Sequence, residues 1–260
     1  MAERVADYDR IAHGYDWRYG LHEYAGVRET LLSFVGSTRH EAILEVGCGT
    51  GHWLSIVQDR AAIVAGLDPS REMLRHAAEA VPRARLVRAS AQSLPWRDEA
   101  FDRVFCVNAL HHVGDRMRFF DEARRVLKPG GGLLSIGKDP HADRDQWWVY
   151  DYFPETIAID RERFAPVRRL RGELALAGFT WAESFEADRI EAVRSPADAL
   201  SAGIVDRAYT SQLTVLSDEE YEAGVARIRT ATADLVTDFR LYATVGWLKG
   251  SHQPSALSHS

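Results

Sequence analysis

The feature that most constrains the fold is a short apolar run that leads directly into a glycine-rich loop and then into a helix. The run AILEV (42–46) is followed by Gly47, Gly49 and Gly51 and then by HWLSIVQ (52–58), whose apolar residues share one helical face. Glycine lacks a Cβ, so it lets the backbone approach a ligand closely and adopts positive φ without strain. The helix start offers unpaired N–H groups to a carboxylate or phosphate. This order predicts a ligand-binding turn at the end of a buried strand.

The spacing of the glycines discriminates between ligands. A dinucleotide fingerprint, G-x-G-x-x-G, requires glycine at position 52, where this chain has His52. This argues against a nicotinamide-linked oxidoreductase. Asp68 ends the next apolar run, AIVAGL (62–67), and an acid there can accept hydrogen bonds from both hydroxyls of a ribose. An aspartate at a strand end is by itself more often a helix N-cap, but beside the glycine loop ribose binding is favoured.

Apolar runs and amphipathic segments alternate along the first half of the chain. We expect further strands at 85–89, 101–107 and 132–137, and helices from 70 to 80 and from 115 to 127. The second helix closes on Lys-Pro and three glycines, a strong stop signal. Such alternation is typical of right-handed βαβ crossovers around a parallel sheet.

The second half of the chain is less regular. It predicts a helix over 160–177, a strand over 179–190, a helix from 218 to about 237 and a strand over 238–250. No repeat and no Pro/Gly/Ser-rich linker divides the chain, so we expect one domain with an insertion. The expected organisation is a set of N-terminal lid helices over 1–40, a main domain over 41–250 that carries a helical insertion over 191–237, and a flexible tail over 251–260.

Composition limits the class of protein and its partners. With 46% apolar and 27% charged residues, the 260-residue chain is typical of a globular protein rather than a disordered or disulfide-scaffold one. The net charge of −6 provides no basic field for nucleic acid, so no nucleic-acid partner is expected. Two cysteines, Cys48 and Cys106, and no His/carboxylate cluster at ligand spacing predict no metal site. Neither a signal peptide nor a membrane-length apolar run is evident, so we expect a cytoplasmic protein away from membranes.

Five motifs in order carry a resemblance to a known family: EVGCGTG (45–51), GLDPSREML (66–74), AQSLPW (91–96), FDRVFCVNALHHV (101–113) and LKPGGGLL (127–134). Together they resemble the class I S-adenosylmethionine-dependent methyltransferases, in particular the small-molecule branch that includes the ubiquinone-biosynthesis (methyltransferase type 11) enzymes. The leader YDRIAHGYDW resembles the lid helix of that branch. The resemblance implies a Rossmann-like α/β three-layer sandwich. Its sheet would have seven mostly parallel strands in the order 3-2-1-4-5-7-6, with the last strand antiparallel.

The resemblance also implies the contacts with S-adenosylmethionine. The glycines and an acid would surround the methionyl part, Asp68 would hold the ribose, and the segment after the third strand would meet the adenine. The family commonly has an acid where this chain has Ser90, which is the one departure. The cofactor-binding set implied is Glu45, Gly47, Gly49, Gly51, Asp68, Pro69, Met73, Ser90, Ala91, Gln92 and Asn108, with Tyr15 as a residue that either closes over the cofactor together with Tyr8 or anchors its helix.

The expected reaction is displacement at the sulfonium methyl by an O, N, C or S atom of a small-molecule acceptor, with S-adenosylhomocysteine as product. Because the cofactor carries a good leaving group, the protein's role is positioning, water exclusion and, where needed, proton removal. His112, after the fourth strand, is the candidate general base, although a packing or capping role is the alternative. The competing function is a non-catalytic protein that binds S-adenosylmethionine or S-adenosylhomocysteine.

An acceptor pocket is expected where aromatic residues follow the fifth strand, roofed by 139–160 and the insertion. Its candidate residues are His111, Trp147, Tyr150 and Tyr152, for which core packing is the ordinary alternative. They favour an apolar or aromatic acceptor. Two further groups are interpreted as structural. Cys48 is expected to be a buried thiol, and the arginines at 161, 163, 168, 169 and 171 a solvated helix face.

Overall fold

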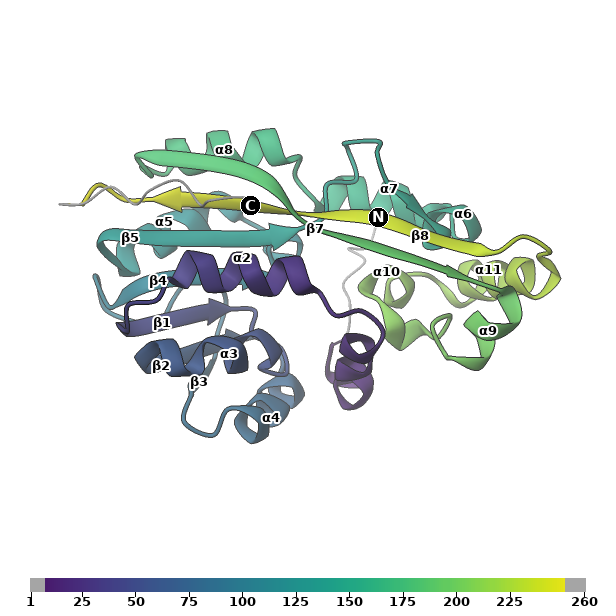
Figure 1. Cartoon of the computed structure of the whole chain (residues 1–260), viewed down its shortest axis with the longest axis horizontal. Helices are drawn as coiled ribbons and strands as arrows, with labels where there is room; N and C mark the ends of the chain where they lie inside the picture. Colours follow the sequence, from purple (N-terminus) through teal and green to yellow (C-terminus); the bar gives the residue numbers. More distant parts are fainter. Residues whose placement is uncertain (1–7, 251–260) are drawn as a thin grey trace.

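The computed structural model describes residues 8–250, so the first seven residues of the expected lid and the expected tail over 251–260 lie outside the described residues. One sheet with helices on both faces forms the body of the molecule (Figure 1). Five parallel strands make its first half in the order β3-β2-β1-β4-β5. They are followed by β8, which is antiparallel to β5, and by β7, which is antiparallel to β8 and so runs in the direction of the first five. The strands are β1 (His40–Val46), β2 (Ala61–Asp68), β3 (Arg85–Arg88), β4 (Phe101–Val107), β5 (Leu127–Gly137), β6 (Gln146–Trp147), β7 (Trp181–Arg194) and β8 (Leu235–Trp247).

The predicted strand order is confirmed, with one addition. Counted without the two-residue β6, the strands follow 3-2-1-4-5-7-6, and β8 pairs antiparallel with both β5 and β7. The eighth strand, β6, pairs with Thr237 and Asp238 near the start of β8. Two residues are too few to produce an alternating or continuous apolar pattern, so the sequence predicted seven strands.

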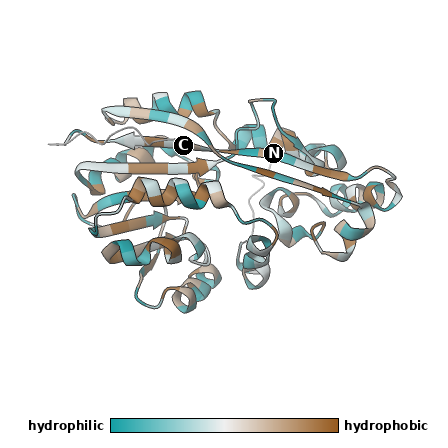
Figure 2. Ribbon diagram, in the orientation of Figure 1, coloured by the Kyte–Doolittle hydropathy of each residue, from teal (hydrophilic) through white to brown (hydrophobic). Residues whose placement is uncertain are grey.

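Helices cover both faces of the sheet, and one apolar cluster lies between the sheet and the helices on each face. One cluster includes residues of α2 (Ala25–Val35) and α3 (His52–Val57), and the other includes residues of α5 (Arg116–Val126) and α8 (Val167–Leu176). In Figure 2 the helices carry hydrophilic as well as hydrophobic residues, whereas β5 is mostly hydrophobic. This is the pattern expected when a parallel strand is buried on both faces and a helix on only one.

The long β7 and β8 extend well beyond the end of β5 (Figure 1). Residues 242–247 of β8 pair with β5, whereas residues 235–241 pair with β7 without β5 alongside. The extension carries the segment between these two strands. That segment holds α9 (Pro196–Ser201), a 3₁₀ turn (Arg207–Tyr209), α10 (Ser211–Thr214) and α11 (Asp218–Thr230), and it lies near α6 (Trp148–Tyr152) and α7 (Glu155–Arg163).

Several predicted element boundaries are wrong. The single helix expected over 160–177 is two helices, α7 and α8, because Pro166 lacks an N–H and restricts the residue before it. The helix expected from 218 to about 237 ends at Thr230, and the strand expected from 238 starts at Leu235. The strand expected to end at 190 continues to Arg194, since pairing with β8 supports it.

The N-terminal helical prediction is realised in three pieces. They are α1 (Tyr8–Ile11), a 3₁₀ segment (Ala12–Gly20) and α2, which ends at Gly36 with φ of 78°. Two of the remaining helices have the N-caps that their sequences predict. In α4 (Arg71–Ala80) the Ser70 hydroxyl accepts from an amide of the first turn, as does the Asp115 carboxylate in α5. None of the helices within residues 8–250 is long and apolar enough to span a bilayer.

Candidate functional site

The glycine loop joins β1 to α3 at the carboxyl edge of the parallel strands. Gly47, Gly49 and Gly51 all have positive φ, at 74°, 51° and 85°. A Cβ added to Gly47 would overlap the Ala109 side chain, so this position requires glycine. The amides of Gly47 and Cys48 donate to the Leu67 carbonyl at 2.7 and 3.0 Å. The loop is therefore fixed to the end of β2, where Asp68 lies.

Asp68 connects the loop to the start of α4. Its Oδ2 accepts from the Gly49 amide and its Oδ1 from the Ser70 amide, both at 2.9 Å. The side chain is buried, and burial raises the pKa of this carboxyl. Each carboxylate oxygen accepts more than one hydrogen bond, so capacity remains for a ligand hydroxyl.

Glu45 lies at the end of β1 with a carboxylate oxygen that has no partner. The residue is 1% exposed, and its Oε2 forms no hydrogen bond to the described part of the chain. Burial and the negative charge of Asp68 raise the pKa of Glu45 well above its usual value. A buried acceptor without a donor is unfavourable, and it suits a ligand that brings a cation or N–H group.

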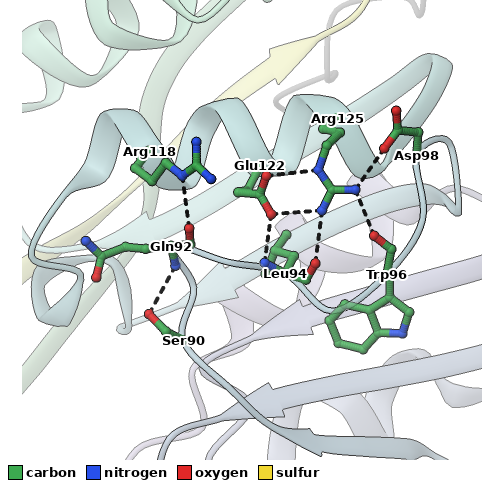
Figure 3. Close-up of polar contacts among 8 residues, drawn as sticks. All are labelled: Ser90, Gln92, Leu94, Trp96, Asp98, Arg118, Glu122 and Arg125. Carbon is green, nitrogen blue, oxygen red and sulfur yellow. Dashed lines mark hydrogen bonds and ion pairs between the residues drawn. The ribbon is translucent and has the colours of Figure 1, made fainter.

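The segment after β3 is held in place by α5 (Figure 3). Glu122 accepts from the Leu94 amide at 2.8 Å and pairs with Arg125, which donates to the carbonyls of Leu94 and Trp96 at 2.9 and 2.7 Å. At the start of the same segment the Gln92 amide donates to the Ser90 hydroxyl at 3.2 Å. The hydroxyl of Ser90 and the Gln92 amide are thus bonded to each other, and Ala91 between them is half-buried.

The N-terminal segment covers α4 and the glycine loop. Ile11 and Ala12, with the rings of Tyr8 and Tyr15, pack on Met73, which is 1% exposed. Asp9 accepts from the Ser70 hydroxyl at 2.5 Å at the start of α4, beside the exposed Pro69. A further hydrogen bond joins the Thr50 hydroxyl in the loop to the Asp16 carboxylate.

Two adjoining cavities lie beyond the ends of β4 and β5. The larger has a volume of about 670 Å³ and the smaller about 410 Å³. His111, Lys138 and Phe164 line both cavities. The larger is also lined by Tyr8, Tyr15, Arg18, Tyr19, Tyr24, Asn108, Trp147, Tyr209, Thr210, Ser211, Gln212, Phe239 and Leu241.

The structure brings some of the predicted site residues together at these cavities and leaves others apart. Asn108, His111, Tyr15 and Trp147 line the larger cavity. Tyr150 instead donates to Asp160 at 2.8 Å, and Tyr152 lines neither cavity. Asn108 has φ of 51°, which is uncommon for a residue with a side chain and is typical of functional sites. The expected ribose and adenine contacts, from Asp68 to Gln92, line neither cavity.

The two histidines differ in their contacts. The Tyr8 hydroxyl lies 2.6 Å from Nε2 of His112, which is exposed to solvent and lines neither cavity, whereas Tyr8 lines the larger one. His111 stacks on Phe164 with ring centres 4.0 Å apart, and its Nε2 forms no hydrogen bond within residues 8–250. Enclosure by surrounding protein atoms, together with positive charges that include Arg163, lowers the pKa of both imidazoles. Both are therefore neutral near pH 7, and the tautomer of His112 decides which partner donates in its hydrogen bond with Tyr8.

Three cations at the cavities were missed by sequence reasoning. The Arg18 guanidinium lies 3.5 Å from the Tyr15 ring centre, and Lys138 Nζ lies 3.1 Å from that of Trp147. Arg163, interpreted above as part of a solvated face, is half-buried, lines the smaller cavity and donates to Asp160 at 2.7 Å. The one available signal was position: Lys138 directly follows a predicted strand, at the edge where open sheets bind ligands.

Two other expectations concern a thiol and a metal. Cys48 is buried, and burial together with Glu45 raises the pKa of its thiol well above the usual value, which disfavours a nucleophilic thiolate. Within the part of the chain that the structure describes, no three His, Cys, Asp or Glu side chains gather in a way that could hold a metal ion.

Known proteins similar to this chain share its motifs and fold. Residues 44–135 match the family described as "Methyltransferase domain". The demethylmenaquinone methyltransferase of Tropheryma whipplei (strain Twist) is 33% identical over 132 residues, 49% of this chain and 55% of that protein, so the chain spans about half the length of this relative. The malonyl-[acyl-carrier protein] O-methyltransferase of Pseudescherichia vulneris is 30% identical over 200 residues, 65% of this chain and 77% of that protein. A crystal structure of an S-adenosylmethionine-dependent methyltransferase from Thermotoga maritima has a TM-score of 0.59 at 19% identity and covers 93% of this chain and 98% of that one, which shows the fold.

Proposed function

Since the chain belongs to the S-adenosylmethionine-dependent methyltransferase family, we propose that it transfers the methyl group of S-adenosylmethionine to a small-molecule acceptor. The observation that carries the proposal is the juxtaposition of the glycine loop, held by Asp68, with a cavity lined by Asn108, whose neighbour Ala109 packs on Gly47. Ligands of open α/β sheets bind at this edge, beyond the carboxyl ends of the strands.

The residues at the loop fit the cofactor. The unpartnered Oε2 of Glu45 would accept from an ammonium group, and the remaining acceptor capacity of Asp68 would serve the ribose hydroxyls. At Gly49 a Cβ would meet only the Tyr15 ring, at 3.9 Å, so the backbone of the loop is approachable there. We add Arg18 to this set, because it lies on Tyr15, which faces Gly49, and would pair with a carboxylate held at the loop.

When bound, S-adenosylmethionine supplies a methyl group on a sulfonium, which is a good leaving group. The chain's own part is to orient the acceptor and exclude water. The surfaces for this are the aromatic side chains that line the larger cavity and the N-terminal segment that covers α4. Nε2 of His112 would accept a proton from the acceptor only after its hydrogen bond with Tyr8 is exchanged for one with the acceptor. We therefore propose His112 as base and Tyr8 as the residue that holds it neutral and oriented.

Calorimetric titration of the purified chain with S-adenosylmethionine and S-adenosylhomocysteine tests the proposal. We expect micromolar binding of both, and a weakening of about 10- to 100-fold in Asp68→Ala, which loses ribose contacts and the anchor of the loop. Asp121→Ala, at an exposed position of α5, is the matched control and should bind as the wild type does. Absence of binding in a folded chain would refute the proposal. Binding without methyl transfer to any acceptor in a broad screen would favour the non-catalytic alternative.

A further inference from the structure

Buried side-chain nitrogens without partners gather where the two cavities meet. Lys138 Nζ, His111 Nε2 and two guanidinium nitrogens of Arg163, Nε and Nη1, are inaccessible to solvent and form no hydrogen bond with the described residues. Lys138 and His111 line both cavities, and Arg163 lines the smaller one. Buried donors are nearly always bonded in folded proteins, so a cluster of unsatisfied donors around a cavity indicates a ligand rich in acceptor oxygens.

The cluster lies next to the position expected for the reacting methyl group. Asn108 follows β4 and Lys138 follows β5, and these strands are direct neighbours with Val107 opposite Ile136. The Asn108 amide donates to the Ile136 carbonyl at 2.7 Å, so the pairing holds to the last residue. Neighbouring strands lie about 4.8 Å apart, which puts Lys138 within reach of a small molecule held at Asn108.

Lys138 forms no hydrogen bond with a carboxylate of the described residues, although Asp160 and Asp145 lie near enough to favour its charged form. Asp160, fully buried, bonds Arg163 at 2.7 Å, and it accepts from Tyr150 and Gln212, both at 2.8 Å. Asp145 is bonded to Arg240. Lys138 is left with ring contacts, its Nζ lying 3.1 Å from the Trp147 ring centre and 4.4 Å from that of Phe239.

A buried ammonium without a bonded anion is unfavourable, and burial lowers the pKa of Lys138 to about 7. An anion bound beside it would restore the full charge. Arg163 cannot neutralise this site either, because it is itself cationic and its single bonded carboxylate is Asp160.

Building on the methyl transfer proposed above, we propose that the acceptor carries an anionic group, a carboxylate or a phosphate, that pairs with Lys138 and the free nitrogens of Arg163. The apolar body of the acceptor then lies against Phe164 and Trp147, towards Asn108. The same pairing explains why a lysine lies against the rings of Trp147 and Phe239. A leucine or methionine would fill this space without the free-energy cost of removing an ammonium group from water.

Three probes of matched size test the proposal by calorimetry: benzoate, phenyl phosphate and the neutral benzamide. Each is titrated into the full-length chain with and without saturating S-adenosylhomocysteine. We expect one or both anions to bind about 10- to 100-fold more tightly than benzamide, as a charge-assisted hydrogen bond provides. The tighter of the two anions distinguishes a carboxylate acceptor from a phosphate one.

Substitutions at Lys138 then assign the effect. Lys138→Met keeps a similar stem without the charge and should abolish the preference for the anions, whereas Lys138→Arg should keep it. Lys128→Met is the matched control, because Lys128 lies at the opposite end of β5, bonded to Glu41 and Asp102 at 2.6 and 3.1 Å. Thermal unfolding and S-adenosylhomocysteine affinity of each variant report on the fold and on the cofactor site separately.

Two results would overturn the proposal: equal affinities of the wild type for the anions and benzamide, or an unchanged preference in Lys138→Met. Failure of the methyltransferase function looks different. In that case S-adenosylhomocysteine does not bind, while the anion preference in its absence, and its loss in Lys138→Met, still report on the cluster.

Discussion

At the scale of single residues, the site holds polar groups in states that water would not favour. Glu45 has an orphan carboxylate oxygen, and Lys138 an ammonium without a hydrogen-bonded anion. Each would gain a partner from a cofactor or acceptor. Such residues reduce the stability of the ligand-free chain and make binding energetically more favourable, a trade-off common at functional sites.

Glu45→Gln should separate stability from binding. Burial and Asp68 raise the pKa of Glu45, so this carboxyl favours the unfolded chain progressively as pH rises above its ordinary value of 4.5. Removing the charge should stabilise the ligand-free chain by roughly 1–3 kcal/mol at pH 8, and by less at pH 5. Affinity for S-adenosylmethionine should fall at least about tenfold, since the acceptor for its ammonium is lost. Urea unfolding at the two pH values and calorimetry measure both effects, and lower stability together with unchanged affinity would contradict this role.

At the scale of secondary-structure elements, α5 determines the conformation of the segment that follows β3 (Figure 3). Glu122→Gln should weaken the pairing with Arg125 and leave Leu94 held by a weaker acceptor. We expect a loss of about 1–3 kcal/mol in unfolding free energy and faster hydrogen exchange at the Leu94 amide, with weaker cofactor binding through the adjacent Ser90–Gln92 turn. Asp121→Asn on the exposed side of the same helix is the control. Exchange at Leu94 equal to that of the wild type would show that Glu122 does not hold this segment.

The same scale separates what was predictable from what was not. The alternation of strands and helices around the parallel core follows from local patterns, because apolar runs such as AILEV and AIVAGL alternate with amphipathic segments. The strand order came instead from the resemblance to the family. The burial of the Arg163 side chain was not predictable, since the cavity that it lines is formed by tertiary packing, although its partner Asp160 lies three residues earlier in the same helix. Ser90 shows the same limit: its departure from the family pattern was visible, but its hydrogen bond with Gln92 was not.

At the scale of the whole molecule, the larger cavity is divided between the parallel sheet and the segment carried by β7 and β8. Asn108 and Lys138 come from the ends of β4 and β5, whereas Thr210, Ser211 and Gln212 come from between β7 and β8. Cofactor contacts are expected from the sheet side and from the N-terminal segment, and none from the segment between β7 and β8. A change confined to the β7–β8 side should therefore alter acceptor binding and leave cofactor binding intact.

Gly224→Ala makes such a change. Gly224 lies in α11, and a Cβ there would overlap the ring of Phe153, which is fully buried beyond α6. Removing this overlap requires α11 or the ring to shift, which should lower the free energy of unfolding by about 1–3 kcal/mol. We expect affinity for the anionic probe to fall several-fold while affinity for S-adenosylhomocysteine stays within about twofold, as for sites without shared partners. Gly172→Ala in α8, where a Cβ meets nothing within 4 Å, is the control and should stabilise the chain by about 0.5–1 kcal/mol with both affinities unchanged. Parallel loss of both affinities in Gly224→Ala would show instead that the two sides of the cavity respond as one unit.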